Sequence, residues 1–127
     1  MLIFAVRKFR EDMEIRQIIR FEGEDGLGLW SSKNGYIGQI NPEIAARHKH
    51  FNTPLEDGLR IESKWYCGYK SIDQMTEWIQ PSEIRDILEA GYDVWLIEAT
   101  EYQVGAHQVI FTKSSEVSRK KINQLFA

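Results

Sequence analysis

A tryptophan and two serines are the side chains whose types and spacing best suit a ligand in this sequence. Trp30, Ser31 and Ser32 lie between Gly28 and an Asn-Gly turn signal at residues 34–35, in the stretch GLGLWSSKNG. An exposed indole stacks on a planar ligand with a free energy of about 1–3 kcal/mol per base-like ring, and the small neighbours let such a ligand approach. We therefore expect a strand end that forms one wall of a binding cleft.

The histidines and the cysteine do not form a metal site by their spacing. His48 and His50 are two residues apart near the end of a predicted helix, where such a pair does not share a face, and His107 is distant in sequence. No carboxylate stands at ligand spacing, so we expect no bound metal. The single cysteine, Cys67, excludes an intrachain disulfide, and its aromatic neighbours predict a buried thiol.

The carboxylates occur in clusters to which the sequence assigns no reaction. No nucleophile elbow, P-loop, dinucleotide fingerprint or HExxH motif is present. Two acidic segments, residues 22–25 and 56–57, fall in predicted loops, where charge is normally solvated.

Length, composition and charge restrict the class of protein. The 127 residues suit one domain that spans residues 1–127, and 43% hydrophobic with 28% charged residues is typical of a soluble globular protein. The net charge of −3 argues against a nucleic-acid partner. The basic run at residues 119–121 falls at the end of a predicted helix, where cations also suit the helix dipole.

The hydropathy of the chain argues against a membrane or an exported location. No apolar run reaches the roughly 18 residues of a membrane span. The start, MLIFAVRKF, is apolar before it is basic, which is the reverse of a signal peptide. We expect a cytoplasmic protein with no membrane contact.

Hydrophobic periodicity predicts strands and helices mixed along the chain. The predicted strands are residues 1–9, 11–21 (with a helix as the alternative), 61–70, 93–99 and 107–112. The predicted helices are residues 41–51, 71–79, 81–90 and 114–127. The apolar run at 93–99 predicts a central strand buried on both faces. The pattern indicates an α+β fold in a single compact domain, with a mainly antiparallel, possibly split sheet, a helical pair that covers it and a C-terminal helix.

Local signals mark the ends of the predicted helical pair. Ser71 and Gln74 form a capping box at the start of the first helix, and Pro81 opens the second. Gly91 ends the second helix in the left-handed position. Residues 101–107 are predicted to form a turn between two strands.

Three short segments together resemble the strand layout of the ADP-ribosyltransferase fold: FAVRK, GLGLWSS and AHQVIF. The resemblance implies an anion contact at Arg7, a nicotinamide pocket at residues 30–32 and a ribose contact at position 108, beside His107. The family has a glutamate at the last position. Gln108 is neutral and cannot supply the negative charge that stabilises an oxocarbenium-like cation.

A second resemblance covers about half of the sequence. The pattern NTPLEDG … CGYKSIDQMTEWI … EIRDILEAGYDVWLIEA … HQVIF is similar to small phage and prophage proteins that share no assigned activity. This resemblance implies a viral accessory protein that acts in the cytoplasm of a bacterial host, against host defence.

Three functions follow from these patterns. The first is a non-catalytic protein, without a cofactor, that binds a nucleotide-like molecule or a host protein in a cleft. The residues expected to line that cleft are Arg7, Trp30, Ser31, Ser32, His107 and Gln108. The second is an NAD-dependent mono-ADP-ribosyltransferase in which Glu98 or Glu101 replaces the missing carboxylate. The third is a protein–protein inhibitor without a small-molecule pocket, whose acidic loops meet a basic host protein.

Overall fold

The computed structural model describes residues 14–29, 40–48, 59 and 65–126. Its strands are β1 (Arg16–Glu22), β2 (Trp65–Gly68), β3 (Asp93–Ala99), β4 (Tyr102–Val104), β5 (Val109–Thr112) and β6 (Glu116–Lys121). Its helices are α3 (Pro42–His48), α4 (Ile72–Trp78) and α5 (Pro81–Glu89), with short 3-10 turns η1 (Lys113–Ser115) and η2 (Asn123–Phe126). The strands form two three-stranded antiparallel sheets, in the orders β1-β3-β6 and β2-β5-β4. The predicted α+β class and the split antiparallel sheet are confirmed.

The first sheet is built around β3, which pairs with β1 on one side and β6 on the other. The strand interpretation of residues 11–21 is confirmed where β1 begins at Arg16. β3 is central, as predicted, but the expectation that it is buried on both faces is wrong for Trp95 and Leu96, which are partly exposed. The helices cover the sheet around Val94 and the second sheet covers it around Ile97, so the middle of β3 stays accessible.

The second sheet joins the first at one pair of residues. Ile19 N donates to Tyr69 O at 2.7 Å, and Tyr69 N donates to Ile19 O at 2.8 Å. The chain reaches this contact through Gly68, where an added Cβ would lie 2.5 Å from Ile18 Cγ2 and 2.9 Å from the carbonyl oxygen of Ile19. Glycine at this position therefore lets β2 pass close to β1.

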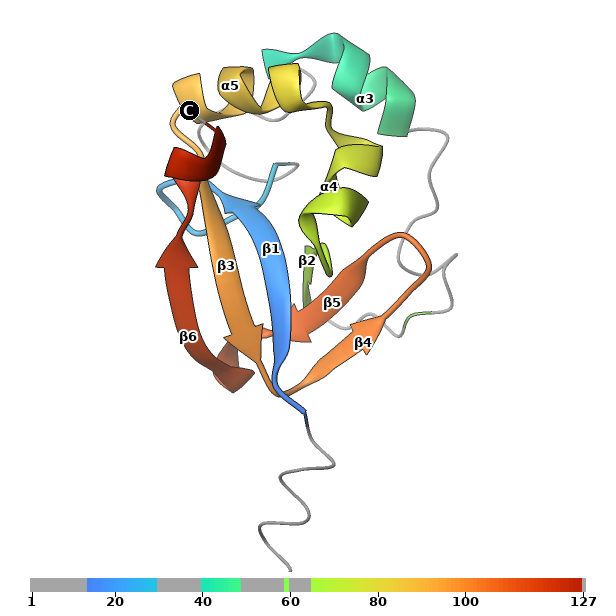
Figure 1. The fold of residues 1–127 in the computed structure, drawn as a ribbon, viewed down its shortest axis with the longest axis vertical. Helices are drawn as coiled ribbons and strands as arrows, with labels where there is room; N and C mark the ends of the chain where they lie inside the picture. The colour runs from blue at the N-terminus through green and yellow to red at the C-terminus, as the bar shows by residue number, and fades with distance from the viewer. Residues whose placement is uncertain (1–13, 30–39, 49–58, 60–64, 127) are drawn as a thin grey trace, which may run out of the picture.

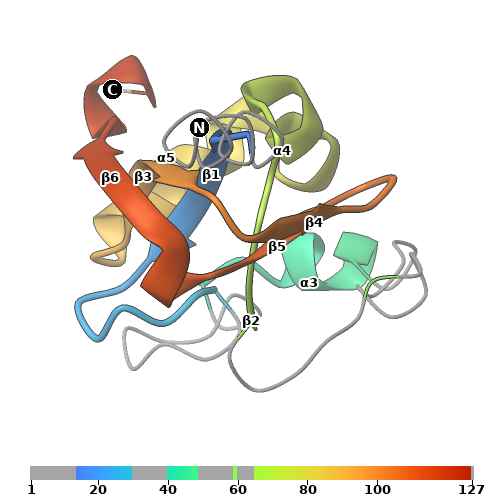
Figure 2. The ribbon, with the colours of Figure 1, turned by 90° about the horizontal axis from the view of Figure 1, so that it is seen from below.

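Alternate residues of β1 pack into two separate cores, as expected for side chains on opposite faces of a strand. Ile19 and Phe21 face the helices. They pack with Met75, Ile79, Ile84, Ile87 and Val94. Ile18 faces the second sheet and packs with Ile97, Ala99, Val109 and Phe111. Figure 1 shows the three helices gathered at one end of the molecule, above the strands, and Figure 2 shows the same ribbon from below.

The predicted ends of α4 and α5 are confirmed by their hydrogen bonds. Ser71 Oγ accepts from the backbone N of Gln74 at 3.0 Å. Pro81 is the first residue of α5, and Gln80 N donates to Glu83 Oε1 at 2.7 Å. Gly91 has φ of +99°, a left-handed conformation that only glycine adopts without strain.

The predicted C-terminal helix at residues 114–127 is wrong. The structure has β6 there, between the short turns η1 and η2. The four residues between Val117 and Ile122 are polar, so no apolar stripe with helical spacing exists to bury. Pairing with β6 satisfies backbone N–H and C=O groups of β3. A helix at residues 114–127 would leave these groups without hydrogen-bond partners from this segment. The basic residues 119–121 therefore lie on a strand and not at a helix end.

Two smaller expectations also need correction. The turn predicted at residues 101–107 contains the strand β4, and the turn itself is closed by Gly105 N donating to Gln108 O at 2.8 Å. Cys67 is exposed, although a buried thiol was expected. Its neighbour Tyr66 packs into the core between the sheets, so the alternation of β2 turns Cys67 away from that core.

Candidate functional site

Four residues of the cleft predicted from the sequence lie outside the described residues: Arg7, Trp30, Ser31 and Ser32. The described residues do place His107 and Gln108, which lie in the turn between β4 and β5. The structure therefore tests one side of that predicted cleft.

Side chains of α4 hold this helix against the turn that contains His107 and Gln108. Trp78 Nε1, from α4, donates to the carbonyl oxygen of His107 at 2.7 Å, and Gln74 Nε2 donates to Ala106 O at 3.4 Å. The side chain of Gln108 is buried. His107 Nδ1 is 3.9 Å from Glu77 Oε2. The turn is thus anchored by side chains of α4 that hydrogen-bond to its backbone.

The candidate carboxylates do not meet Gln108. Glu98 Oε1 accepts from Ser118 Oγ at 2.6 Å in the first sheet. Glu101 Oε1 accepts from Thr112 Oγ1 at 2.7 Å, at the opposite end of β5 from Gln108. With a rise of about 3.3 Å per strand residue, the length of β5 separates Glu101 from Gln108 by roughly 13 Å. The three positions are spread over two sheets and do not form one constellation.

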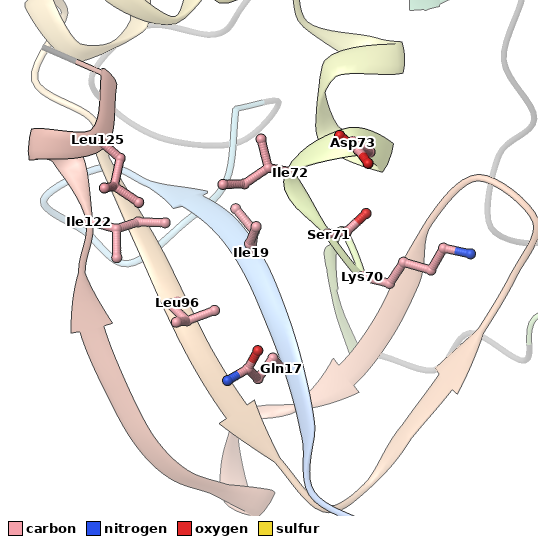
Figure 3. A pocket seen from close by; sticks show the side chains of 9 residues that line it. All are labelled: Gln17, Ile19, Lys70, Ser71, Ile72, Asp73, Leu96, Ile122 and Leu125. Carbon is pink, nitrogen blue, oxygen red and sulfur yellow. The ribbon is translucent and has the colours of Figure 1, made fainter.

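A groove on the helix side of the first sheet is a cavity lined by described residues. It has a volume of about 360 Å³ and lies between β1, β3, the start of α4 and the C-terminal turn η2 (Figure 3). Its apolar lining consists of Ile19, Ile72, Leu96, Ile122 and Leu125. Its polar lining consists of Gln17, Lys70, Ser71 and Asp73.

The lining of the groove is mostly aliphatic and partly open to solvent. Ile72 is 40% exposed and Leu125 is 62% exposed, which leaves two large apolar side chains at its rim. Figure 3 shows Leu125 beside Ile122 and Ile72 across from them at the start of α4, with Asp73 on α4 and Lys70 just before that helix. Such a surface favours an apolar side chain over a charged ligand. The groove unites four distant segments, so no local pattern of the sequence predicts it.

A buried carboxylate, Glu22, forms the strongest electrostatic feature among the described residues. Glu22 is 3% exposed and lies at the end of β1, so its assignment to a solvated acidic loop is wrong. Its carboxylate accepts from Arg20 Nε at 2.9 Å and from Arg119 Nη1 at 2.9 Å, and Lys113 Nζ lies 3.5 Å away. We call Arg20, Glu22, Lys113 and Arg119 the Glu22 cluster.

The pKa of Glu22 reflects both its burial and its partners. Burial alone would raise the pKa of this carboxyl, but the hydrogen bonds and positive charges of Arg119 and Arg20 hold it below its ordinary value. Glu22 is therefore ionised at neutral pH, and its charge is compensated within the protein.

Aromatic rings extend the Glu22 cluster between the sheets. The guanidinium carbon of Arg20 lies 5.2 Å from the centre of the Tyr66 ring, and Lys113 Nζ lies 4.8 Å from it. Arg119 lies 4.9 Å from the Trp95 ring centre. Lys113 Nζ also donates to the carbonyl oxygen of Gly26 at 3.0 Å, which ties the loop after β1 to η1. These contacts stabilise the arrangement of the sheets. They also engage the positive charges of Arg20, Lys113 and Arg119 within the protein.

The remaining acidic loop residues divide between described and undescribed segments. Glu24 and Asp25 are exposed in the loop after β1. Residues 56–57 lie outside the described residues. That these acidic loops form the binding surface of a protein–protein inhibitor therefore stays a prediction.

The described segments contain neither a metal-binding cluster nor a helix that could span a membrane. No group of three or more histidine, cysteine, aspartate or glutamate side chains there could hold a metal ion. None of the helices in these segments has the length and apolar character needed to cross a membrane.

Comparison with known proteins identifies a family but no characterised relative. No curated protein and no solved structure matches the chain. A family model described as "Bacteriophage T4 Y00F protein" matches residues 13–124. That match covers β1 to β6, the whole Glu22 cluster and the residues that line the groove except Leu125. The chain therefore belongs to the bacteriophage T4 Y00F protein family.

Proposed function

We propose that this phage accessory protein is a non-catalytic binding protein, and that its groove takes an apolar side chain of a bacterial host protein. The observation that carries the proposal is the aliphatic lining of the groove, with Ile72 and Leu125 exposed at its rim. Burying a side chain of this size fully stabilises a complex by about 1.5–3 kcal/mol. A few such contacts at the centre of an interface are typical of binding hot spots.

A protein segment suits this groove better than a nucleotide. The lining contains no aromatic ring for a base and no arginine for a phosphate. Its one cation, Lys70, lies near the opposite charge of Asp73 on the same rim. A nucleotide-like ligand would instead depend on Arg7 and residues 30–32, as the sequence predicts.

The transferase alternative has less support from the geometry of the described residues. Glu98 and Glu101 each hydrogen-bond a neighbouring hydroxyl, and neither is near Gln108. A replacement for the missing carboxylate would have to lie beside the ribose to stabilise positive charge there. In our proposal the protein acts by occupying a host component involved in defence, in the bacterial cytoplasm, and not by modifying it.

A capture experiment with matched variants tests the groove. Tagged wild-type protein, Leu125→Glu and Val104→Glu would be incubated with lysate of the bacterial host, and the retained proteins would be compared. Val104 is 43% exposed on β4 and does not line the groove, so it controls for the added charge. We expect one host protein to be retained by wild type and Val104→Glu and to be lost with Leu125→Glu.

Two results would contradict the proposal. One is equal retention of the same host protein by all three variants. The other is a thermal shift with NAD or ADP-ribose that persists in Leu125→Glu, because this result would favour a nucleotide site away from the groove.

A further inference from the structure

Among the described strands, β6 lies at an edge of the first sheet. In the order β1-β3-β6 it pairs with β3, and no other described strand pairs with it on its outer side. Residues 117–121 are all exposed. Figures 1 and 2 show β6 on the outside of the molecule in both views. An edge of this kind presents backbone N–H and C=O groups that can pair with another chain.

The side chains of β6 give this edge a positive charge. Its sequence, EVSRKK, has one acidic residue and three basic residues. Arg119 is held by Glu22 and Glu116, and Lys121 Nζ lies 3.5 Å from Asp93 Oδ2. Lys120 has no ion-pair partner among the described residues. Arg119 and Lys121 are therefore held by acidic residues of this protein, whereas the charge of Lys120 is available to a partner.

We propose that β6 binds an extended acidic segment of another protein as an additional strand. Strand addition uses main-chain hydrogen bonds for affinity and alternate side chains for specificity. Acidic residues opposite Arg119, Lys120 and Lys121 would form cross-strand pairs of opposite charge on both faces of the sheet. Lysine at a sheet edge commonly prevents pairing with the strands of other chains. Here we expect the positive charge to disfavour pairing with neutral or basic strands and to favour pairing with acidic ones.

A second copy of this chain fits the edge less well. If β6 paired with itself in an antiparallel manner about a two-fold axis at Lys120, Lys120 of each copy would face Lys120 of the other, and Arg119 would face Lys121. Like charges directly opposite each other destabilise strand pairing. An acidic strand, in contrast, meets all three cations of β6 with opposite charge.

The inference is independent of the groove, because it concerns the outer edge of the sheet. The test is an NMR titration of the isotope-labelled full chain with a short peptide of alternating threonine and glutamate, and with its threonine–lysine counterpart. We expect the acidic peptide to shift the amide signals of residues 117–121, with weaker binding at higher salt. The basic peptide should leave these signals in place.

Matched variants locate the charge that is responsible. Lys120→Glu should weaken binding of the acidic peptide about two- to fivefold, as expected for one cross-strand charge pair. Arg85→Glu, an equal change of charge at an exposed position of α5, should leave binding unchanged. Leu125→Glu should also leave it unchanged, so failure of the groove proposal would not affect this result.

Three outcomes would overturn the inference. The first is equal binding of the two peptides. The second is a set of shifted amides that excludes β6. The third is self-association of the wild-type chain through β6 in sedimentation experiments, because a homodimer would then occupy the edge.

Discussion

Arg119 Nη1 donates a hydrogen bond to Glu22 Oε1 at 2.9 Å, although the two residues are 97 positions apart in the chain. The bond joins the end of β1 to β6 across β3, which lies between them in the sheet. Glu22 is buried and also contacts Arg20 and Lys113, so one carboxylate joins cations from three segments.

Removing the charge of Glu22 should destabilise the fold. Glu22→Gln removes the carboxylate that Arg20 shares with Arg119, and only Arg119 keeps another, Glu116. Removing one partner of a fully buried ion pair typically costs about 3–5 kcal/mol. Lys113 and Arg119 are each about one-third exposed, so we expect the lower end of this range. Urea unfolding followed by tryptophan fluorescence measures the change. Glu14→Gln, at an exposed position before β1, should change stability by less than about 0.5 kcal/mol.

The same carboxylate should make stability depend on acidic pH. The pKa of Glu22 is lowered from its ordinary value of 4.5 in the folded protein, so the unfolded chain binds the proton first as pH falls. Its stabilising contribution is present above pH 4.5 and is lost as pH falls below that value through the folded-state pKa. The free-energy difference between wild type and Glu22→Gln should therefore shrink as pH falls below 4.5. A difference that stays constant over this range would contradict the assignment.

A methyl group at position 68 should disturb the junction of the two sheets. In Gly68→Ala the new Cβ would lie 2.5 Å from Ile18 Cγ2 and 2.9 Å from a backbone oxygen, so the strands must separate. We expect a loss of about 1–3 kcal/mol, as for other overpacked sites. Faster hydrogen exchange at Ile19 and Tyr69 would report weakening of their paired hydrogen bonds. Gly28→Ala is the control, because its Cβ would lie 3.4 Å from the nearest Arg20 atoms, an ordinary van der Waals distance.

The contact between α4 and the β4–β5 turn should depend on a tryptophan nitrogen and a backbone oxygen. Trp78→Phe removes the donor to His107 O and leaves that carbonyl without this hydrogen bond, which should cost about 1–3 kcal/mol. His107→Ala keeps the carbonyl, and its side chain is 41% exposed, so this change should cost much less. Equal destabilisation by the two variants in thermal unfolding would show that the imidazole, and not the backbone, holds the turn.

The sequence predicts those parts of the fold whose causes are local. The ends of α4 and α5 follow from Ser71, Pro81 and Gly91, whose effects act within a few residues. The strand β6 was assigned to a helix because its pairing partner, β3, lies about twenty residues away along the chain. The residue pattern within β6 does not indicate that β3 is its pairing partner.

The candidate site was less predictable than the fold, because it is assembled from distant segments. Glu22 appears in the sequence as one acid among several near a glycine-rich loop, and only the approach of Arg119 and Lys113 shows that it is buried. The groove depends on Ile72 and Leu125 lying near each other across the sheet. The cleft predicted around Trp30 and Arg7 remains a prediction.

The alternation of β1 has a consequence for how the strand finds its register. Ile18 and Ile19 face opposite cores but are chemically identical, so a slip of one residue would turn each toward the other core and each face would still receive an isoleucine. The same slip would bring Arg20 and Glu22 toward the helices and Phe21 toward the cations. The discrimination between the two registers therefore rests on residues 20–22, where a misplaced charge would be buried without its partner. The ionic residues of β1 thus select the arrangement that its isoleucines alone leave ambiguous.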